Sequence, residues 1–178
     1  MEWLNPPAKF SEEHDIIRAV TLPKTDFWRV THYDFTKQNA HFYHIPVRGD
    51  FELNVTVRGD YRDNYDQAGF MIYADETNWI KAGIEYTCGV RNISAVITRE
   101  FSDWSVLPLA VPSDLVHFRA VRKKESVEVF YSLDGINFTM YRLGYLSLRE
   151  EVLAGMMCAS PMGEGFSVEF EGFSVRSI

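Results

Sequence analysis

Residues 51–58 read Phe51-Glu52-Leu53-Asn54-Val55-Thr56-Val57-Arg58, a strict alternation of apolar and polar side chains. Successive side chains of a β-strand point to opposite faces, so the four apolar side chains share one face and the four polar ones share the other. The stretch therefore predicts an antiparallel strand with one face on a core and the other in solvent.

Comparable segments follow along the chain. We expect further strands at about 66–74, 79–87, 90–98, 116–122, 126–132, 138–143, 152–159 and 165–177. Turn-forming stretches such as Asp134-Gly135 separate them. No segment of helical length keeps its apolar residues at three- and four-residue spacing between two caps, and short turns are expected at 11–14 and 147–151. Many short strands at hairpin spacing predict an all-β sandwich or barrel.

The apolar side chains change face within the last expected strand. Phe166, Val168 and Phe170 share one parity, whereas Phe173 takes the other, with Gly172 just before it. A β-bulge adds one residue to a strand and reverses the phase of the side chains that follow. We therefore expect a bulge and a kink at Gly172, at an edge or corner of a sheet.

Size and charge narrow the class of protein. The chain has 178 residues, of which 46% are hydrophobic and 15% aromatic, enough to bury one sizeable core, so we expect a single domain over 1–178. The net charge of -7 argues against nucleic acid and anionic membranes as partners, because both bind clustered Lys and Arg.

The N-terminus and the cysteines indicate a cytoplasmic protein. Residues 1–7 have neither the basic start nor the apolar run of a secretion signal, and no later apolar stretch is long enough to span a bilayer. Nothing requires Cys88 and Cys158 to pair, and we expect both to be free thiols.

The hairpin over 65–86 holds the densest group of candidate binding residues. In its second arm Trp79, Lys81, Gly83 and Glu85 share the face opposite the core. An aromatic ring beside polar groups above a glycine suits a sugar, since the ring stacks on C–H bonds and the polar groups bind hydroxyls. The alternative is a solvated sheet face whose Lys and Glu pair with cross-strand neighbours.

Further candidates come from five other positions and from the first arm of the hairpin. Phe118 and Ala120 fit the core, which leaves Arg119 on the opposite side of its strand, where its guanidinium could bind a pair of hydroxyls. Trp104 lies in a loop or an edge strand. The expected ligand-binding set is Trp79, Lys81, Glu85, Gln67, Arg119 and Tyr73, with Trp28, His32, Tyr33 and Trp104 at the rim.

Several motifs resemble one family. They are Thr25-Asp26-Phe27-Trp28, Thr31-His32-Tyr33, Tyr65-Asp66-Gln67-Ala68-Gly69, Trp79-Ile80-Lys81-Ala82-Gly83-Ile84-Glu85-Tyr86 and Ser102-Asp103-Trp104-Ser105. In this order they resemble a family of unknown function in the concanavalin A-like lectin/glucanase superfamily that includes the regulation-of-enolase proteins. The resemblance implies an all-β jelly-roll sandwich of two curved antiparallel sheets. It also implies that the concave face carries the sugar site or, in some relatives, catalytic carboxylates.

Enzyme chemistry has little support in the sequence. The glucanase signature of alternating acidic residues along one strand is missing, and Glu85 with Asp66 is the one carboxyl pair we would nominate for glycoside hydrolysis. The histidines are scattered, and neither a phosphate-binding glycine loop nor a nucleophile elbow occurs. We expect no metal and no cofactor.

The leading hypothesis is a non-catalytic binding module for a carbohydrate or sugar-like ligand on the concave sheet face. The first alternative is a protein-interaction or regulatory protein of metabolism, which predicts a protein partner and an exposed apolar patch. The second is a weak glycoside-active enzyme that uses Glu85 as an acid or base.

Overall fold

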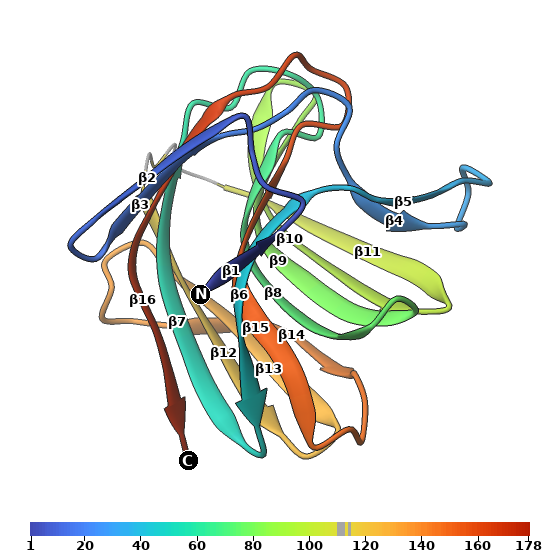
Figure 1. Cartoon of the computed structure of the whole chain (residues 1–178), viewed down its shortest axis with the longest axis vertical. Helices are drawn as coiled ribbons and strands as arrows, with labels where there is room; N and C mark the ends of the chain where they lie inside the picture. Colours follow the sequence, from blue (N-terminus) through green and yellow to red (C-terminus); the bar gives the residue numbers. More distant parts are fainter. Residues whose placement is uncertain (110–112, 114) are drawn as a thin grey trace.

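Two seven-stranded antiparallel sheets and a separate hairpin make up the computed structural model, which describes residues 1–109, 113 and 115–178 (Figure 1). The first sheet runs in the order β1 (Glu2–Leu4), β6 (His41–Arg48), β15 (Glu151–Ala159), β8 (Gln67–Asp75), β9 (Asn78–Thr87), β10 (Val90–Arg99) and β11 (Phe101–Pro108). The second runs in the order β14 (Thr139–Tyr145), β13 (Ser126–Ser132), β12 (Leu115–Lys123), β7 (Phe51–Gly59), β16 (Ser167–Ser177), β3 (Ile16–Val20) and β2 (Lys9–Glu13). The hairpin joins β4 (Phe27–Arg29) to β5 (Thr36–Gln38).

The alternating stretch forms β7 in the middle of the second sheet. Its side chains Phe51, Leu53, Val55 and Val57 are buried between the two sheets, and its polar side chains face outward. Both sheets contribute to this core, for example through Phe70 of β8 and Phe118 of β12. The predicted all-β jelly-roll sandwich is confirmed.

A second apolar cluster covers the outer face of the first sheet. It consists of Phe27, Trp28, Ala40, Phe42, Met71, Trp79, Val96, Met157 and Ala159. The hairpin β4–β5 supplies the covering side chains and lies beyond β10 and β11, on the side away from β7 and β16 (Figure 1). Strands β8, β9 and β10 are therefore buried on both faces over most of their length.

One expected turn is a strand instead. Residues 9–13 form β2, which pairs with β3, and the turn follows at His14 and Asp15. All five side chains of β2 are exposed, and it is an edge strand of its sheet. Without a buried face it has no alternation of apolar and polar residues, and the sequence pattern could not reveal it.

The expected bulge lies in β16. The register of β16 against β7 shifts between Glu171 and Ser174, and Gly172 adopts a φ of 61°, a left-handed value that glycine accepts without strain. Pairing of β16 with β3 ends at Glu171. The kink thus occurs where β16 stops pairing with β3. Because β16 lies between β7 and β3, the kink is in an inner strand of the sheet and not in an edge strand.

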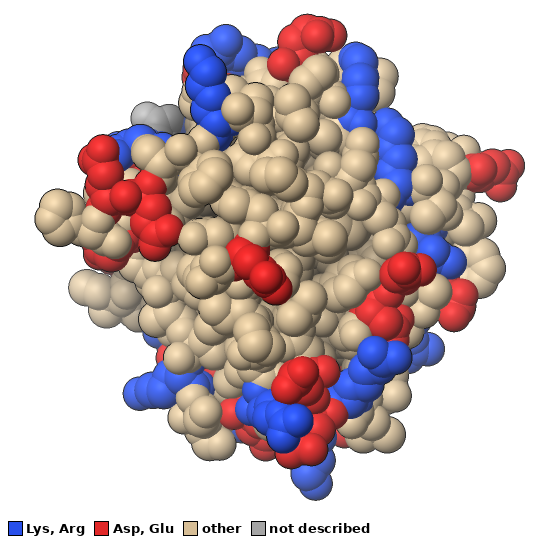
Figure 2. Space-filling model, viewed as in Figure 1, with Lys and Arg blue, Asp and Glu red and all other residues tan. Residues whose placement is uncertain are grey.

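Charged side chains of both signs surround the face of the molecule seen in Figure 2, and its centre is mostly uncharged. Lys and Arg on this face are interspersed with Asp and Glu. Within the described part of the chain, no helix is long and apolar enough to cross a membrane. Cys88 is exposed and Cys158 is buried, and both are free thiols, as expected.

Candidate functional site

A small pocket opens on the outer face of the first sheet, beside the hairpin β4–β5. It has a volume of about 180 Å³. Its polar lining consists of Asp26, Lys37, Gln67, Lys81 and Glu85. Its apolar and aromatic lining consists of Trp28, Tyr33, Phe35, Tyr65, Val96, Trp104, Pro161 and Met162.

Two glycines keep the floor of this region free of side chains. Gly83 of β9 lies opposite Gly69 of β8. A Cβ on Gly83 would lie 2.1 Å from the carbonyl oxygen of Ala68, and one on Gly69 would lie 2.0 Å from that of Ala82. Neither position therefore accepts a side chain, and a gap stays open between Lys81 and Glu85.

An ion pair joins the floor to the covering hairpin. The Lys81 ammonium donates to Asp26 Oδ1 at 2.9 Å, and the two side chains are only 5% and 12% exposed. The backbone holds Asp26 in place, because its N–H donates to Asn39 Oδ1 at 2.9 Å and its carbonyl accepts from Ala40 N at 3.1 Å. Taking two charges out of water is costly, so such a pair is weak evidence for a stabilising role.

Glu85 is the second buried charge of the floor. Its Oε2 accepts hydrogen bonds from Ser94 Oγ at 2.5 Å and from Trp104 Nε1 at 2.8 Å. Burial raises the pKa of Glu85, and the attraction of Lys81 and the two hydrogen bonds oppose that rise. A carboxyl group that is easily protonated can both donate and accept hydrogen bonds inside the pocket.

Aromatic rings stand around the mouth. Trp28 meets Tyr33 edge to face at 5.7 Å, Tyr33 stacks on Phe35 at 5.9 Å, and Tyr65 meets Trp104 edge to face at 6.2 Å. Tyr33, Phe35 and Trp104 are 46%, 40% and 36% exposed. A hydrogen bond with Tyr33 raises the pKa of Tyr65 and links the two sides of the rim. Exposed rings of this kind are available to a ligand.

The loop that carries Tyr33 is strained. Val30, His32 and Asp34 have φ values of 60°, 68° and 55°, in the left-handed region that non-glycine residues rarely enter. Tight backbone hydrogen bonds hold it, including Val30 N to the Phe35 carbonyl at 2.8 Å. Strain of this kind persists where the surroundings over-determine the backbone, and it clusters at ligand-binding positions.

Five of the predicted binding residues meet in the pocket. Lys81, Glu85, Gln67, Trp28 and Trp104 all line it. Trp104 comes from β11, which is an edge strand of the first sheet. Tyr33, expected at the rim, also lines the pocket.

Trp79 does not serve as a stacking platform. It lies on the expected face of β9 but is 0% exposed, because Phe27 of the hairpin packs edge to face against it at 5.7 Å. Tyr73 packs beside the same apolar cluster and also lies outside the lining. Both rings contact Phe27 of the hairpin, and neither lines the pocket.

Arg119 lies on the other sheet, which corrects its expected place on the binding face. It belongs to β12, where its Nε donates to Asn54 Oδ1 at 3.0 Å and its guanidinium lies over Phe138. His32 lies in the strained loop, packed against the ring of Tyr33 at 4.7 Å, outside the residues that line the pocket.

Asp66 does not pair with Glu85. It is fully buried, and its Oδ2 accepts from the backbone N–H groups of Arg62 and Asp63, both at 2.9 Å. Its Oδ1 accepts from Ser160 Oγ at 2.6 Å. These bonds fix the turn before β8, and the second carboxyl group of the pocket is Asp26.

The lining residues that the sequence patterns missed are Asp26, Phe35, Lys37, Tyr65, Val96, Pro161 and Met162. Asp26 carried a signal, since it is an acidic residue inside the motif Thr25-Asp26-Phe27-Trp28. Its role depends on the hairpin folding over a sheet formed by residues much later in the chain, and no local pattern encodes that contact.

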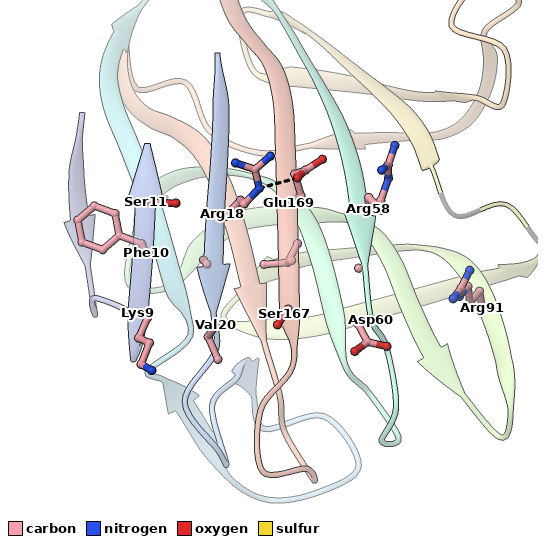
Figure 3. Close-up of a pocket in the computed structure, with 13 residues that line it drawn as sticks. Lys9, Phe10, Ser11, Arg18, Val20, Arg58, Asp60, Arg91, Ser167 and Glu169 are labelled. Carbon is pink, nitrogen blue, oxygen red and sulfur yellow. Dashed lines mark hydrogen bonds and ion pairs between the residues drawn. The ribbon is translucent and has the colours of Figure 1, made fainter. Parts of the chain in front are cut away.

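A larger hollow of about 840 Å³ is lined by residues of β2, β3, β16 and β7 of the second sheet and by Arg91 of β10 (Figure 3). Arg18 and Glu169 form an ion pair there at 2.8 Å, and their side chains are 47% and 23% exposed. The labelled side chains of Arg58 and Arg91 stand apart from this pair. No charged side chain of its described lining is buried, and solvated charges contribute little. The smaller pocket is the better candidate.

The two packed sheets place the chain among the concanavalin A-like β-sandwich proteins. Over residues 3–178 the sequence matches the family described as "Protein of unknown function (DUF1349)", and the chain belongs to that family. The family expected from the motifs is therefore confirmed.

Relatives with names or solved structures agree with this assignment. "Regulation of enolase protein 1" of Saccharomyces cerevisiae is 34% identical over 175 residues, which cover 98% of this chain and 88% of that protein. The crystal structure of a functionally unknown protein from Saccharomyces cerevisiae has 33% identity and a TM-score of 0.96, over 99% of this chain and 96% of the other. The carbohydrate binding module CBM66 from Bacillus subtilis shares the fold, with 11% identity and a TM-score of 0.59 over 98% and 95% of the two chains.

Proposed function

We propose that this protein is a non-catalytic binding module for a carbohydrate or sugar-like ligand, which it holds in the pocket between β9, β11 and the hairpin β4–β5. The observation that carries the proposal is the combination of buried charges on the floor, Lys81 with Asp26 and Glu85, and exposed aromatic rings at the mouth. Rings stack on the C–H faces of a sugar, and the charged groups bind its hydroxyls.

The energetics of the floor support a ligand. Buried ion pairs are often no better for stability than apolar side chains of the same size, and burial also disfavours the charged form of Glu85. Groups that are costly to bury, converge in one pocket and sit beneath a strained loop are typical of binding sites. The fold shared with a carbohydrate binding module is consistent with the proposal, but it does not identify any binding residue in this chain.

Isothermal titration calorimetry against a panel of neutral mono- and oligosaccharides tests the proposal. We expect at least one sugar to bind the native protein, and Glu85→Gln and Trp104→Ala to weaken its binding by about ten- to a hundredfold, the loss typical of a hydrogen bond to a charged group. Glu128→Gln, on β13 of the other sheet, is the matched control and should bind normally.

Two results would reject this function. The first is a panel in which no sugar binds, and the second is a sugar whose affinity is the same in both pocket variants and in the control. The same titrations, followed by analysis of the sugars for cleavage, separate binding from hydrolysis. Turnover that Glu85→Gln abolishes would establish a glycoside-active enzyme in place of a binding module.

A protein-interaction role is the second candidate. The observation that favours it is the set of exposed apolar side chains on the edge strands β11 and β14, among them Phe101 at 61% and Leu143 at 57% exposure. Both line one crevice between the two strands. The name of the yeast relative points to regulation. Charged substitutions of Phe101 and Leu143 that abolish co-purification of a partner, while Glu85→Gln does not, would favour this role.

A further inference from the structure

The size of the pocket limits its ligand, provided that the proposed sugar-binding function holds. Its volume of about 180 Å³ lies below the roughly 300 Å³ at which pockets for drug-sized molecules begin, so it holds one pyranose ring and not two. Side chains from four separate segments stand around it, namely Tyr33 of the hairpin loop, Tyr65 before β8, Trp104 of β11 and Met162 after β15. A rim that surrounds the pocket suits the end of a saccharide chain, whereas a groove open at both ends would suit its internal residues.

The floor offers a donor and an acceptor side by side. The ammonium of Lys81 has three N–H donors, and its hydrogen bond to Asp26 Oδ1 at 2.9 Å uses one of them. Asp26 keeps its second carboxylate oxygen as an acceptor. Two adjacent hydroxyls of a sugar match this arrangement, because one can accept from Lys81 while the other donates to Asp26.

Glu85 supplies a third polar contact. Both of its hydrogen bonds, from Ser94 and Trp104, end on Oε2. Within the described part of the chain no group donates a hydrogen bond to Oε1. This oxygen is not one of the buried polar atoms without a partner, so solvent reaches it. Oε1 is therefore left to a hydroxyl of the ligand, within a side chain that lines the pocket.

The charges around the pocket balance. Asp26 and Glu85 are acidic, whereas Lys81 and Lys37 are basic. A sugar acid or sugar phosphate would lose the hydration of its negative charge and gain no net attraction from a lining with equal numbers of basic and acidic groups, a cost that an uncharged sugar does not meet. The lining thus favours an uncharged ligand.

We propose that the pocket binds the terminal, uncharged pyranose residue of a saccharide, with two adjacent hydroxyls on the Lys81–Asp26 pair and a third polar atom on Glu85. Internal residues of a longer chain do not enter. The aromatic rim contacts the face of the bound ring and leaves its glycosidic oxygen pointing outward.

Calorimetry on the native protein tests this with methyl pyranosides of glucose, galactose, mannose and fucose, their monodeoxy analogues, the corresponding hexose phosphates, and linear and cyclic oligosaccharides. At least one methyl pyranoside should bind, and linear oligomers ending in that sugar should bind within about threefold of it. Removing either hydroxyl of one adjacent pair, or adding the phosphate, should weaken binding by about tenfold or more. Cyclic oligomers, which have no chain end, should not bind.

Three results would overturn the inference while leaving sugar binding intact: linear oligomers that bind much more tightly than the methyl pyranoside, cyclic oligomers that bind as tightly as linear ones, or phosphates that bind best. Failure of every carbohydrate would reject the proposed function as well.

The variants Lys81→Met and Asp26→Asn should lose binding, with Lys123→Met on β12 as the control. If either variant fails to fold, the monodeoxy series on the native protein still decides the role of the adjacent hydroxyls. Variants that fold and bind the methyl pyranoside as tightly as the control would contradict the assignment of the pair.

Discussion

The buried carboxyl group of Glu85 serves the proposed sugar binding, but its ionisation lowers the stability of the fold. Its pKa in the folded protein is raised above the ordinary 4.5, with burial as the main cause, so the folded state holds this proton to higher pH than the unfolded state does. The contribution of Glu85 to stability is most favourable below pH 4.5 and is lost as the pH rises through its raised pKa.

Glu85→Gln should therefore stabilise the protein at pH 8 while it weakens sugar binding. Glutamine has the shape of the protonated acid and cannot ionise, so the melting temperature should exceed that of the native protein at pH 8, and the gain should shrink toward pH 4.5. Thermal unfolding across this range measures it. A variant that is less stable than the native protein at pH 8 would show that the charged form of Glu85 supports the fold.

His41 shows the opposite pH dependence. Its Nε2 accepts from Leu22 N at 2.9 Å while its Nδ1 lies 2.7 Å from the Asn5 carbonyl, an arrangement that requires a neutral ring. Burial lowers the pKa of His41 below the ordinary 6.5, partly opposed by the carbonyls of Asn5 and Pro6. The unfolded chain then binds this proton first as the pH falls.

Stability should accordingly decline as the pH falls below 6.5, by up to about 1.4 kcal/mol per pH unit from this one histidine. Urea unfolding between pH 5 and pH 8 measures the slope. In His41→Asn the slope should be shallower than in the native protein. Identical slopes would mean that His41 does not titrate differently in the folded and unfolded states.

Among the elements, the hairpin β4–β5 depends on Trp79 for its position. Trp79 is fully buried between β9 and Phe27, and replacing it with alanine should cost about 3–5 kcal/mol, as for other large aromatic side chains in cores. The loop over 30–35 should also become accessible, and chymotrypsin should cleave there faster than in the native protein. Unchanged cleavage with the expected loss of stability would mean that other contacts hold the hairpin.

The same residue shows what the sequence could reveal at this scale. Alternation correctly placed Trp79, Lys81 and Glu85 on one face of β9. It could not reveal that Phe27 covers the tryptophan, because strand periodicity describes one strand and not what packs on it. Likewise, Arg119 does point away from Phe118, but placing it required the strand order, which assigns β12 to the other sheet.

The strands before residue 51 escaped prediction, including β6, which has eight residues and lies between β1 and β15. The shortest of them escaped for a related reason. The strands β1, β4 and β5 have three residues each, too few for a periodic pattern to emerge. Central strands such as β7, with one face on the core, gave the clear signal. The fold class followed from these, whereas the pocket required the hairpin that the pattern did not detect.

At the scale of the whole molecule, the two sheets differ in what covers their outer faces. The second sheet presents a polar, solvated outer face, and the first carries both the shared core and a covered outer face with the pocket. The inner faces of the two sheets already form the core of a sandwich. The hairpin that covers one outer face is not needed for that core, so it can shape a binding site. We therefore expect ligand binding on that covered face alone.

The four tryptophans make the most direct test, because each indole N–H gives a signal of its own in a nitrogen–proton correlation spectrum. Trp28 and Trp104 line the pocket, Trp79 is buried beneath the hairpin, and Trp3 stacks on Tyr43 at 4.7 Å, at the edge of the sheet formed by β1. On titration with a sugar that binds, the signals of Trp104 and Trp28 should shift to saturation while that of Trp3 stays in place. A saturable shift of Trp3 with Trp104 and Trp28 unmoved would contradict the account.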